Sequence, residues 1–247
     1  MNDRLANPLF LEKFGFKVYS QNDEDGIIDE IFNRIGETNR TFVEFGVENG
    51  LECNSHYLLH KGWKGLWIEG NERAVKEIAV LFEKPIKSGR LTVVNGFIRK
   101  NNINQLIEMG MGGGGILGDV DMLCIDIDGN DYWVWQEIKC INPRVVVIEY
   151  NAKFPPNFEW IMEYNDNHMW QGDDEQGASL KALELLGRKL GYQLVGTNVS
   201  GVNAFFVRMD LVGELFFMPP ISEKLYNPAR WTMQFISGHP SRKYIGT

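Results

Sequence analysis

The segment TFVEFGVENG (41–50) predicts a buried β-strand that runs directly into a glycine turn. Its first residues are mostly β-branched or aromatic, and a continuous apolar run of this kind is typical of a strand covered on both faces of a sheet. Gly46 and Gly50 then allow a tight turn and a close approach of the backbone to a ligand. We therefore expect an α/β protein whose first strand ends in a ligand-binding loop.

Similar apolar runs recur along the chain and alternate with helical patterns. Further strands are expected at 64–70, 91–96, 121–128, 144–150, 192–197 and 203–209. Helices are expected at 52–61, 72–83 (with Ala74, Ile78 and Leu81 on one face), 101–109, 130–139 and 178–190. This alternation predicts a Rossmann-like, seven-stranded and mostly parallel sheet with right-handed crossovers. The short turn NVSGV between the last two strands predicts an antiparallel edge hairpin.

The 247 residues are expected to form a single domain, because no internal repeat or low-complexity linker divides them. Residues 1–40 are predicted to be a helical N-terminal extension, and 41–150 the cofactor-binding half. Residues 178–247 form the predicted C-terminal half. Since long irregular segments in compact domains are often functional lids, we expect 151–177 to cover the substrate.

Composition and charge exclude several classes of protein. The formal net charge is −8, so we expect no nucleic-acid partner, and a small or neutral acceptor fits better. No apolar run approaches the ~20 residues of a membrane-spanning helix, and the first twenty residues do not have the order of a signal peptide. Three cysteines without a CxxC pair predict a reducing compartment, the cytoplasm.

The predicted strands end in polar residues, where an open parallel sheet binds its ligands. Glu44 and Glu48 make the first loop acidic, which suits a cationic sulfonium better than a pyrophosphate. Glu69 ends the second strand and can accept hydrogen bonds from ribose hydroxyls. Asn95 ends the third strand, where it can bind the adenine edge or the neighbouring backbone.

Four segments together resemble the FkbM-type S-adenosylmethionine-dependent methyltransferases: YSQNDED (19–25), TFVEFGVENG (41–50), GWKGLWIEGN (62–71) and DMLCIDIDG (121–129). The seven-strand layout is also that of class I methyltransferases. The resemblance implies S-adenosylmethionine as the cofactor and O-methylation of a sugar, a polysaccharide precursor or another small metabolite. Together with the strand ends, it gives these predicted cofactor-binding residues: Gln21, Glu44, Gly46, Asn49, Gly50, Glu69, Asn95 and Asp126. The sequence departs from the family pattern in having Glu44 where Asp is common.

Acidic and amide side chains also suggest a metal site. Asp126 and Asp128 follow the fourth strand, and Glu149 and Asn151 follow the fifth. Oxygen ligands of this kind suit Mg²⁺, Mn²⁺ or Ca²⁺, and Mg²⁺ or Mn²⁺ is the predicted metal. The arrangement is similar to the metal site of catechol and macrolide-sugar O-methyltransferases, and a metal there would acidify and orient an acceptor hydroxyl.

The same residues have a structural alternative. Asp128 and Asp131 would then cap the following helix, and Glu149 would pair with Arg144 or Lys153. The sequence leaves the two interpretations open.

The predicted catalytic residues are His168 and Asp126. His168 lies in the insertion YNDNHMWQGDD (164–174), and it is the candidate general base, although most lone histidines are structural or solvated. Aromatic residues of the insertion, such as Trp170, could stack on a sugar or simply provide hydrophobic cover. The stretch 226–240 fits either a completed pocket or a contact in a homo-oligomer.

Two other functions stay open. A nicotinamide-dependent oxidoreductase would need a phosphate-cradling glycine loop at the first strand, and the loop here is acidic. A non-catalytic Rossmann-like binding module would keep the sheet without the chemistry. Within the methyltransferase interpretation, candidates for contact with an anionic acceptor are Arg99, Lys100, Arg230 and Arg242.

Overall fold

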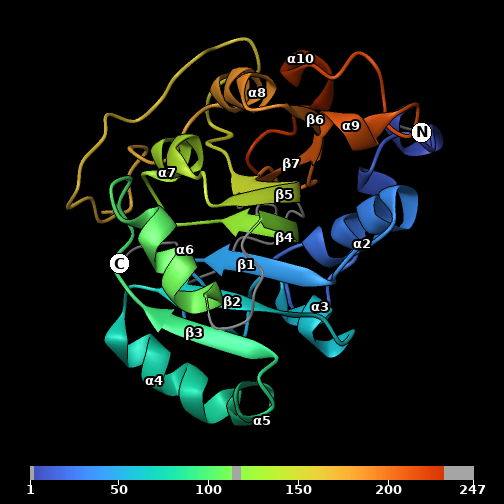
Figure 1. Ribbon diagram of the computed structural model, residues 1–247. Coiled ribbons are helices and arrows are strands. Elements are labelled where there is room, and N and C mark those ends of the chain that lie inside the picture. The colour runs from blue at the N-terminus through green and yellow to red at the C-terminus, as the bar shows by residue number, and fades with distance from the viewer. Residues whose placement is uncertain (1–2, 113–117, 231–247) are drawn as a thin grey trace, which may run out of the picture.

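The computed structural model describes residues 3–112 and 118–230 and contains a seven-stranded sheet between two layers of helices (Figure 1). The strands are β1 (Thr41–Phe45), β2 (Lys64–Glu69), β3 (Leu91–Asn95), β4 (Gly118–Ile125), β5 (Ile141–Glu149), β6 (Tyr192–Thr197) and β7 (Asn203–Arg208). Their order across the sheet is β3-β2-β1-β4-β5-β7-β6. Strands β1 to β5 are parallel, and β7 lies antiparallel between β5 and β6. The predicted mostly parallel sheet with an antiparallel edge hairpin is therefore confirmed.

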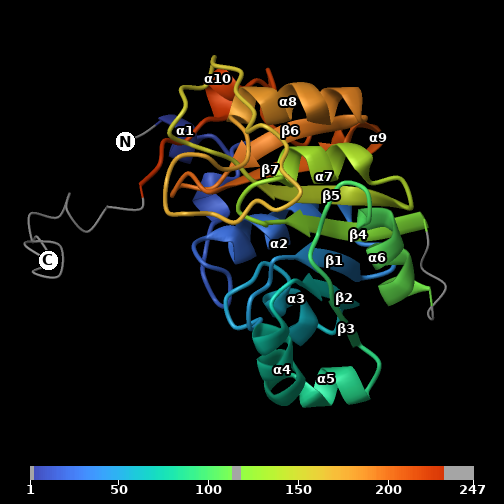
Figure 2. The same ribbon diagram turned by 90° about the vertical axis from the view of Figure 1, so that its left-hand side faces the viewer.

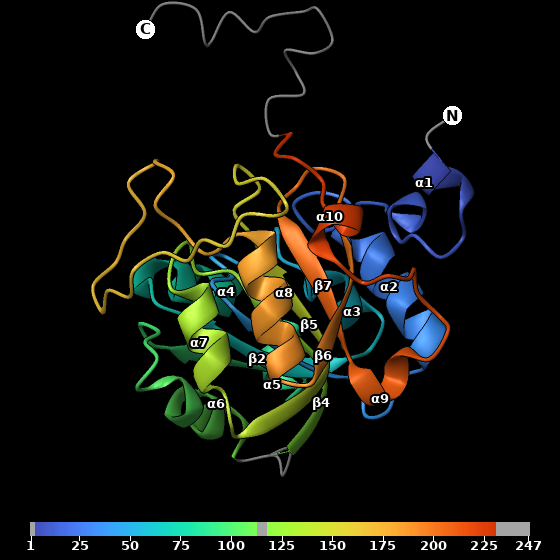
Figure 3. The same cartoon turned by 90° about the horizontal axis from the view of Figure 1, so that it is seen from above.

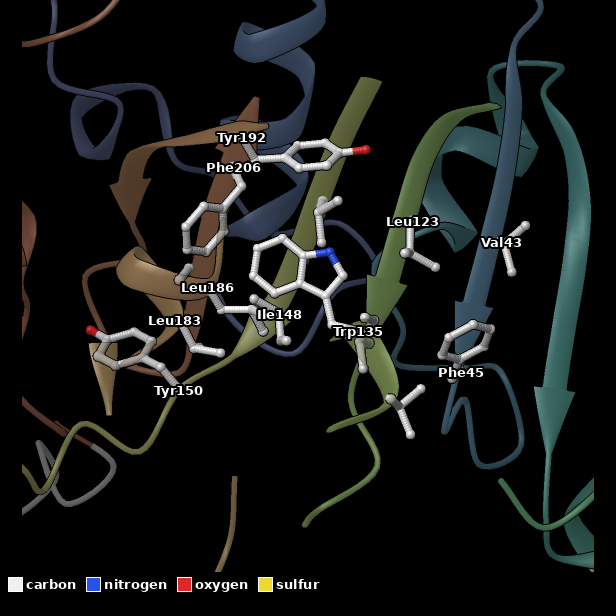
Figure 4. Close-up of a cluster of buried hydrophobic side chains, with 14 of the residues drawn as sticks. Val43, Phe45, Leu123, Trp135, Ile148, Tyr150, Leu183, Leu186, Tyr192 and Phe206 are labelled. Atoms are coloured by element: carbon white, nitrogen blue, oxygen red, sulfur yellow. The ribbon is translucent and has the colours of Figure 1, made fainter. Parts of the chain in front are cut away.

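One face of the sheet is covered by three amphipathic helices: α6 (Ile103–Met111), α7 (Asp131–Glu137) and α8 (Leu180–Lys189). Leu183 and Leu186 point from α8 into this layer, as the leucine spacing predicts (Figure 4). The indole of Trp135 packs against Phe206, with ring centroids 4.9 Å apart (Figure 4). Large side chains from α7, α8 and the strands therefore close this face against water.

The opposite face is covered by four helices: α2 (Glu24–Ile35), α3 (His56–His60), α4 (Glu72–Leu81) and α9 (Met209–Val212). Figure 3 looks onto the β6 edge, with α6 and α7 on one side and α2 and α9 on the other. Ile27, Ile28 and Ile31 of α2 are fully buried in this layer. Part of the predicted N-terminal extension thus belongs to the core.

The expected helix 72–83 is divided in two. Helix α4 ends at Leu81, and a short helix, α5 (Glu83–Lys87), follows it. Pro85 has no N–H to donate to the carbonyl of residue 81, so the first helix cannot continue through it. Leu81, expected on the buried face, is 52% exposed, whereas Phe82 is buried instead.

Three further short elements lie outside the sheet layers: α1 (Asp3–Ala6), the 3₁₀ turn η1 (Glu12–Phe14) and α10 (Ser222–Leu225). Within the described ranges, none of the helices is long and apolar enough to cross a membrane. Residues 231–240 of the C-terminal stretch, and Arg242, lie outside the described residues.

The parallel topology brings the loops that follow β1, β2, β3, β4 and β5 to one edge of the sheet. The arrow of β1 points to this edge in Figure 1, and the long irregular connection between β5 and α8 projects on the same side. When this side faces the viewer in Figure 2, the connection lies in front of the strands. We call residues 150–179 the covering segment.

Candidate functional site

Two large cavities and a smaller third one, of about 280 Å³, lie at this edge of the sheet. The first has a volume of about 580 Å³ and is lined by the loops after β1, β2, β3 and β4. The second has a volume of about 470 Å³ and is lined by the ends of β1, β4 and β5 and the start of β7. Both volumes are in the range of small-molecule sites. The two large cavities share five lining residues: Gly46, Glu48, Asp126, Asp128 and Trp170.

Gly46 lines both cavities and is part of the wall that they share. Its φ is 69°, and a Cβ built on it would lie 1.7 Å from the carbonyl oxygen of Asp126. Its N–H donates to the carbonyl of Ile68 at 3.1 Å. Only glycine lets the first loop lie this close to the ends of the two neighbouring strands.

Glu44 is buried at the wall of the second cavity and organises the same loop. Its carboxylate accepts the backbone N–H groups of Asn54 at 2.8 Å and Ser55 at 2.9 Å, and also the hydroxyl of Ser55. These bonds explain why α3 begins at residue 56 rather than near residue 52. Burial raises the pKa of Glu44.

Gly50 and Asn49, both predicted cofactor residues, line neither of the two large cavities, but Asn49 lines the smaller third cavity with Glu48, Glu69 and Asn71. A Cβ on Gly50 would lie 2.5 Å from the ring of Trp67, so this glycine is required for packing. The Oδ1 of Asn49 accepts the N–H of Leu51 at 3.2 Å and shapes the surface of the loop. Close packing that involves residues far apart in sequence cannot be seen from the glycine spacing alone.

Glu69 lines the first cavity at the end of β2, as predicted for an acid that binds ribose hydroxyls. It is 8% exposed, and its two oxygens accept the N–H groups of Glu48 at 2.8 Å and Asn71 at 2.7 Å. Burial raises its pKa. The two backbone bonds hold the carboxylate in one orientation toward the cavity.

Asn95 does not line the first cavity. Its Nδ2 donates to the carbonyl of Glu69 at 2.9 Å, so the alternative of a bond to neighbouring backbone is the one the structure shows. Phe97 and Ile98, two and three residues further on, line the cavity instead. Their signal in the sequence is an apolar pair that directly follows the Asn-Gly at the end of a strand. This pair was not among the predicted site residues.

Asp126, Asp128 and Glu149 form a carboxylate cluster between the cavities. One oxygen of each lies within 4.8 Å of the others. Burial, and then the neighbouring carboxylates, raise the pKa of Asp126 and of Glu149 well above the ordinary value. Glu149 Oε1 accepts Nε2 of Gln176 at 3.3 Å, whereas among the described residues its buried Oε2 has no partner. Three converging carboxylates with an orphaned oxygen fit a hard divalent cation.

Asn151, the fourth predicted metal ligand, forms hydrogen bonds with the backbone of the covering segment. It is buried, and its Nδ2 donates to the carbonyl of Asp174 at 2.9 Å and to that of Gln176 at 3.2 Å. Its Oδ1 accepts the N–H of Lys153 at 3.3 Å. Gln176, in the irregular part of the chain, takes the place beside Glu149, and no sequence pattern pointed to it.

The alternative interpretation was that Asp128 and Asp131 cap the next helix and that Glu149 forms an ion pair. It is only partly right. Arg144 pairs with Asp121 at 2.8 Å and Lys153 pairs with Asp174, so the predicted pairings of Glu149 are not the ones formed. Asp131 is structural, because its carboxylate accepts the N–H groups of residues 127 and 129 at 2.9 and 2.8 Å. Asp128 has a φ of 52° in the turn that Asp131 closes.

His168 lies in the covering segment and lines the first cavity. Its Nε2 is 3.1 Å from the carbonyl oxygen of Asp128. Asn130 fixes the segment further by donating Nδ2 to the carbonyl of Asn165 at 2.7 Å. The structure therefore places the predicted base beside the carboxylate cluster, with Trp170 shared by both cavities.

Gln21 is exposed and lines the second cavity, beside the predicted cofactor residues Glu44 and Gly46. Its segment is held by Asp25, whose Oδ2 accepts the N–H groups of Val18 at 2.7 Å and Tyr19 at 2.7 Å.

The described basic candidates for an anionic acceptor make other contacts. Arg99 donates to the carbonyl of Asp166 at 3.0 Å, Lys100 lies 4.1 Å from the ring centroid of Tyr164, and Arg230 donates to a carbonyl of the β6–β7 turn. None of these three lines either cavity.

The sequence matches no protein-family model and no curated protein. Similar solved structures include the glycopeptide N-methyltransferase MtfA complexed with S-adenosyl-L-homocysteine, at 12% identity over 80% of this chain and 95% of that chain, with a TM-score of 0.47. A putative caffeoyl-CoA O-methyltransferase from Staphylococcus aureus matches at 12% identity over 74% and 81%, with a TM-score of 0.47. The O-methyltransferase TomG from Streptomyces achromogenes, in complex with S-adenosylmethionine, matches at 14% identity over 83% and 88%, with a TM-score of 0.44. Similarity at this level is a similarity of fold.

Proposed function

We propose that this protein is an S-adenosylmethionine-dependent O-methyltransferase of the FkbM type that acts on a hydroxyl of a sugar, a polysaccharide precursor or another small metabolite. The observation that supports it best is the pair of adjoining cavities, one with Glu69 at its wall and the other with the carboxylate cluster. A cofactor that passes beside Gly46 from the first cavity into the second would bring its methyl group to the carboxylate cluster, where the acceptor would lie.

The first cavity suits an adenosine group. Glu69 offers oriented carboxylate oxygens to ribose hydroxyls, and Phe97 and Ile98 offer apolar surface to an adenine ring. Asp126 and Glu44 lie where the methionine end would follow, and a sulfonium cation there would favour their ionised forms by offsetting the repulsion that helps to raise the pKa of Asp126. Methyl transfer needs little more from the protein than alignment, because the sulfonium is already activated.

Asp126, Asp128 and Glu149 would hold a Mg²⁺ or Mn²⁺ ion, and the ion would supply acidification and orientation of the acceptor hydroxyl. The proton then needs an acceptor, and our candidate is His168, which lines the first cavity and adjoins the cluster at Asp128, a residue of both cavities. A carbonyl oxygen only accepts hydrogen bonds, so Nε2 of a neutral His168 carries the hydrogen toward Asp128. This tautomer leaves Nδ1 with the lone pair that can take a proton.

The nicotinamide alternative gains no support from the first loop. A pyrophosphate binds best at the N-terminus of a helix that begins at the glycine turn. Here α3 begins ten residues after Gly46, and the carboxylate of Glu44 already occupies the N–H groups of residues 54 and 55. A dinucleotide phosphate would instead meet Glu48, Asp126 and Asp128.

Replacing Glu69 with Gln is expected to weaken S-adenosylmethionine binding by about 10- to 100-fold, because a hydrogen bond to a charged group contributes about 1.5–3 kcal/mol. Isothermal titration calorimetry measures the change. Glu72→Gln is the matched control, since the Glu72 side chain lies three residues further on and is 72% exposed. Equal affinities for the two variants would contradict the assignment of Glu69 to the ribose.

Replacing His168 with Gln is expected to lower kcat by about 10²- to 10⁴-fold and to change cofactor affinity far less, because Gln is of similar size at the wall of the first cavity. Gln keeps an N–H that can donate to the carbonyl of Asp128, so the covering segment should stay in place, but it cannot take a proton. The measurements are kcat over a range of pH and the dissociation constant of S-adenosylhomocysteine. A variant with normal kcat and an unchanged pH profile would exclude His168 as the base.

A further inference from the structure

We infer that the acceptor is a hydroxyl- or amine-bearing compound without phosphate or carboxylate groups, and that Asn203 accepts a hydrogen bond from it. The inference rests on the proposed function, because it treats the second cavity as the place where the acceptor binds.

The charged side chains that line the second cavity are all acidic. Among the described residues, no Lys, Arg or His side chain lines it. Six acidic side chains do: Glu44, Glu48, Glu52, Asp126, Asp128 and Glu149. A divalent cation held by three carboxylates still leaves the lining net negative. The methionine end of the cofactor brings an ammonium group beside its own carboxylate. An anionic acceptor has no such internal partner and would lose its hydration without gaining a cationic one, whereas a polyol or an amine would not meet this repulsion.

Asn203 provides a second and independent observation. It is 2% exposed, lines the second cavity and lies opposite Glu149 in the β5–β7 pairing. Its Nδ2 donates to Oε1 of Glu24 at 3.1 Å, and within the described ranges its Oδ1 has no hydrogen-bond partner. A buried acceptor without a donor is costly, so a ligand that donates an O–H or N–H group would complete this site.

Glu24 is the positioning residue for this amide. It is buried, and its carboxylate also accepts Nδ2 of Asn198 at 2.6 Å and the N–H of Asn22 at 2.7 Å. Both oxygens of this side chain accept N–H groups, so the NH₂ end of Asn203 faces Glu24. The carbonyl end of Asn203 is thereby fixed as the acceptor available to a ligand.

The first test is a melting-temperature assay on the full chain saturated with S-adenosylhomocysteine and Mg²⁺. The probes are methyl glucoside, glucosamine and glucose 6-phosphate, at equal concentration and constant ionic strength. A ligand of the folded state raises the melting temperature by mass action, so we expect a rise with methyl glucoside or glucosamine and none with glucose 6-phosphate. A larger rise with glucose 6-phosphate, or no rise with any probe, would overturn the inference. Loss of the S-adenosylhomocysteine effect itself would instead count against the proposed function.

The second test compares Asn203→Ala with Asn198→Ala. Each variant removes one donor to Glu24, but only Asn203 lines the cavity. We expect both to melt at a lower temperature and to bind S-adenosylhomocysteine normally, and only Asn203→Ala to need a roughly tenfold higher probe concentration for the same shift. An unchanged probe response in Asn203→Ala would contradict the assignment. The probe series on the unmodified chain remains decisive if that variant does not fold.

Discussion

Replacing Glu149 with Gln is expected to lower methyl transfer by about 100-fold or more, because substitutions of even the groups that support a metal ligand typically cost 10- to 100-fold. The substitution removes one of the three carboxylates of the cluster and its orphaned oxygen. Glu149 does not line the first cavity, so binding of S-adenosylhomocysteine should change little. Loss of turnover with retained cofactor binding is therefore the expected combination.

The same substitution is expected to stabilise the metal-free protein at neutral pH. Burial and the neighbouring carboxylates raise the pKa of Glu149, so the folded state favours its protonated form. The stability that this carboxyl contributes is present below its unfolded pKa of about 4.3, and it is lost as the pH rises through the higher folded pKa. Gln is neutral throughout, so we expect a melting temperature roughly 2–4 °C higher per kcal/mol gained.

Differential scanning calorimetry with and without Mg²⁺ measures this effect. The unmodified protein should gain stability from the ion, and Glu149→Gln should gain little. Glu214→Gln is the control, because Glu214 is exposed and lines neither cavity at the strand ends. Normal turnover and a normal response to Mg²⁺ in Glu149→Gln would exclude the carboxylate cluster as a metal site.

Replacing Gly46 with Ala is expected to abolish cofactor binding and to destabilise the fold. The left-handed backbone costs a non-glycine residue about 1–2 kcal/mol. The new Cβ would also lie 1.7 Å from the carbonyl oxygen of Asp126, so the loops after β1 and β4 would have to separate. Overpacking of this kind adds about 1–3 kcal/mol and deforms the wall between the two cavities.

The Gly89→Ala variant separates the cost of the left-handed backbone from the cost of the close contact with Asp126. Gly89 has a similar φ of 71°, but a Cβ there has no atom within 4 Å. Urea unfolding should therefore show a smaller loss of free energy of unfolding for Gly89→Ala than for Gly46→Ala, and calorimetry should show normal cofactor affinity only for Gly89→Ala. Equal stability and equal affinity in the two variants would show that the close approach of Gly46 to Asp126 has no functional role.

Hydrophobic periodicity was sufficient to predict the fold. Strands β4 and β5 contain the continuous apolar runs 122–125 and 145–148, and α8 has leucines at helical spacing, so their types could be assigned without tertiary information. Boundaries were less accurate where a distant side chain sets them. The late start of α3 depends on Glu44, and the end of α4 depends on Pro85.

Parallel sheets bind ligands at the carboxyl ends of their strands, and this rule located the site residues whose positions depend on the strand order. Glu69, Asp126 and Glu149 come to one edge because their strands are parallel neighbours of β1 or β4. Asn151 forms its hydrogen bonds with the covering segment, because two residues past a strand end the chain has already turned into that segment.

Asn203 could have been found from the sequence. An antiparallel β7 beside β5 must start where β5 ends, which places Asn203 opposite Glu149. Gln176 could not have been found, because its place depends on the path of an irregular segment of the chain.

If the paired cavities bind S-adenosylmethionine next to a metal site, both ligands should raise the melting temperature of the protein. The measurement uses S-adenosylmethionine and S-adenosylhomocysteine at saturating concentration, each with and without Mg²⁺ or Mn²⁺. Because a ligand bound only by the folded state stabilises it, we predict a clear rise with either cofactor form and a further rise when the metal is added. No rise with either form would contradict the account.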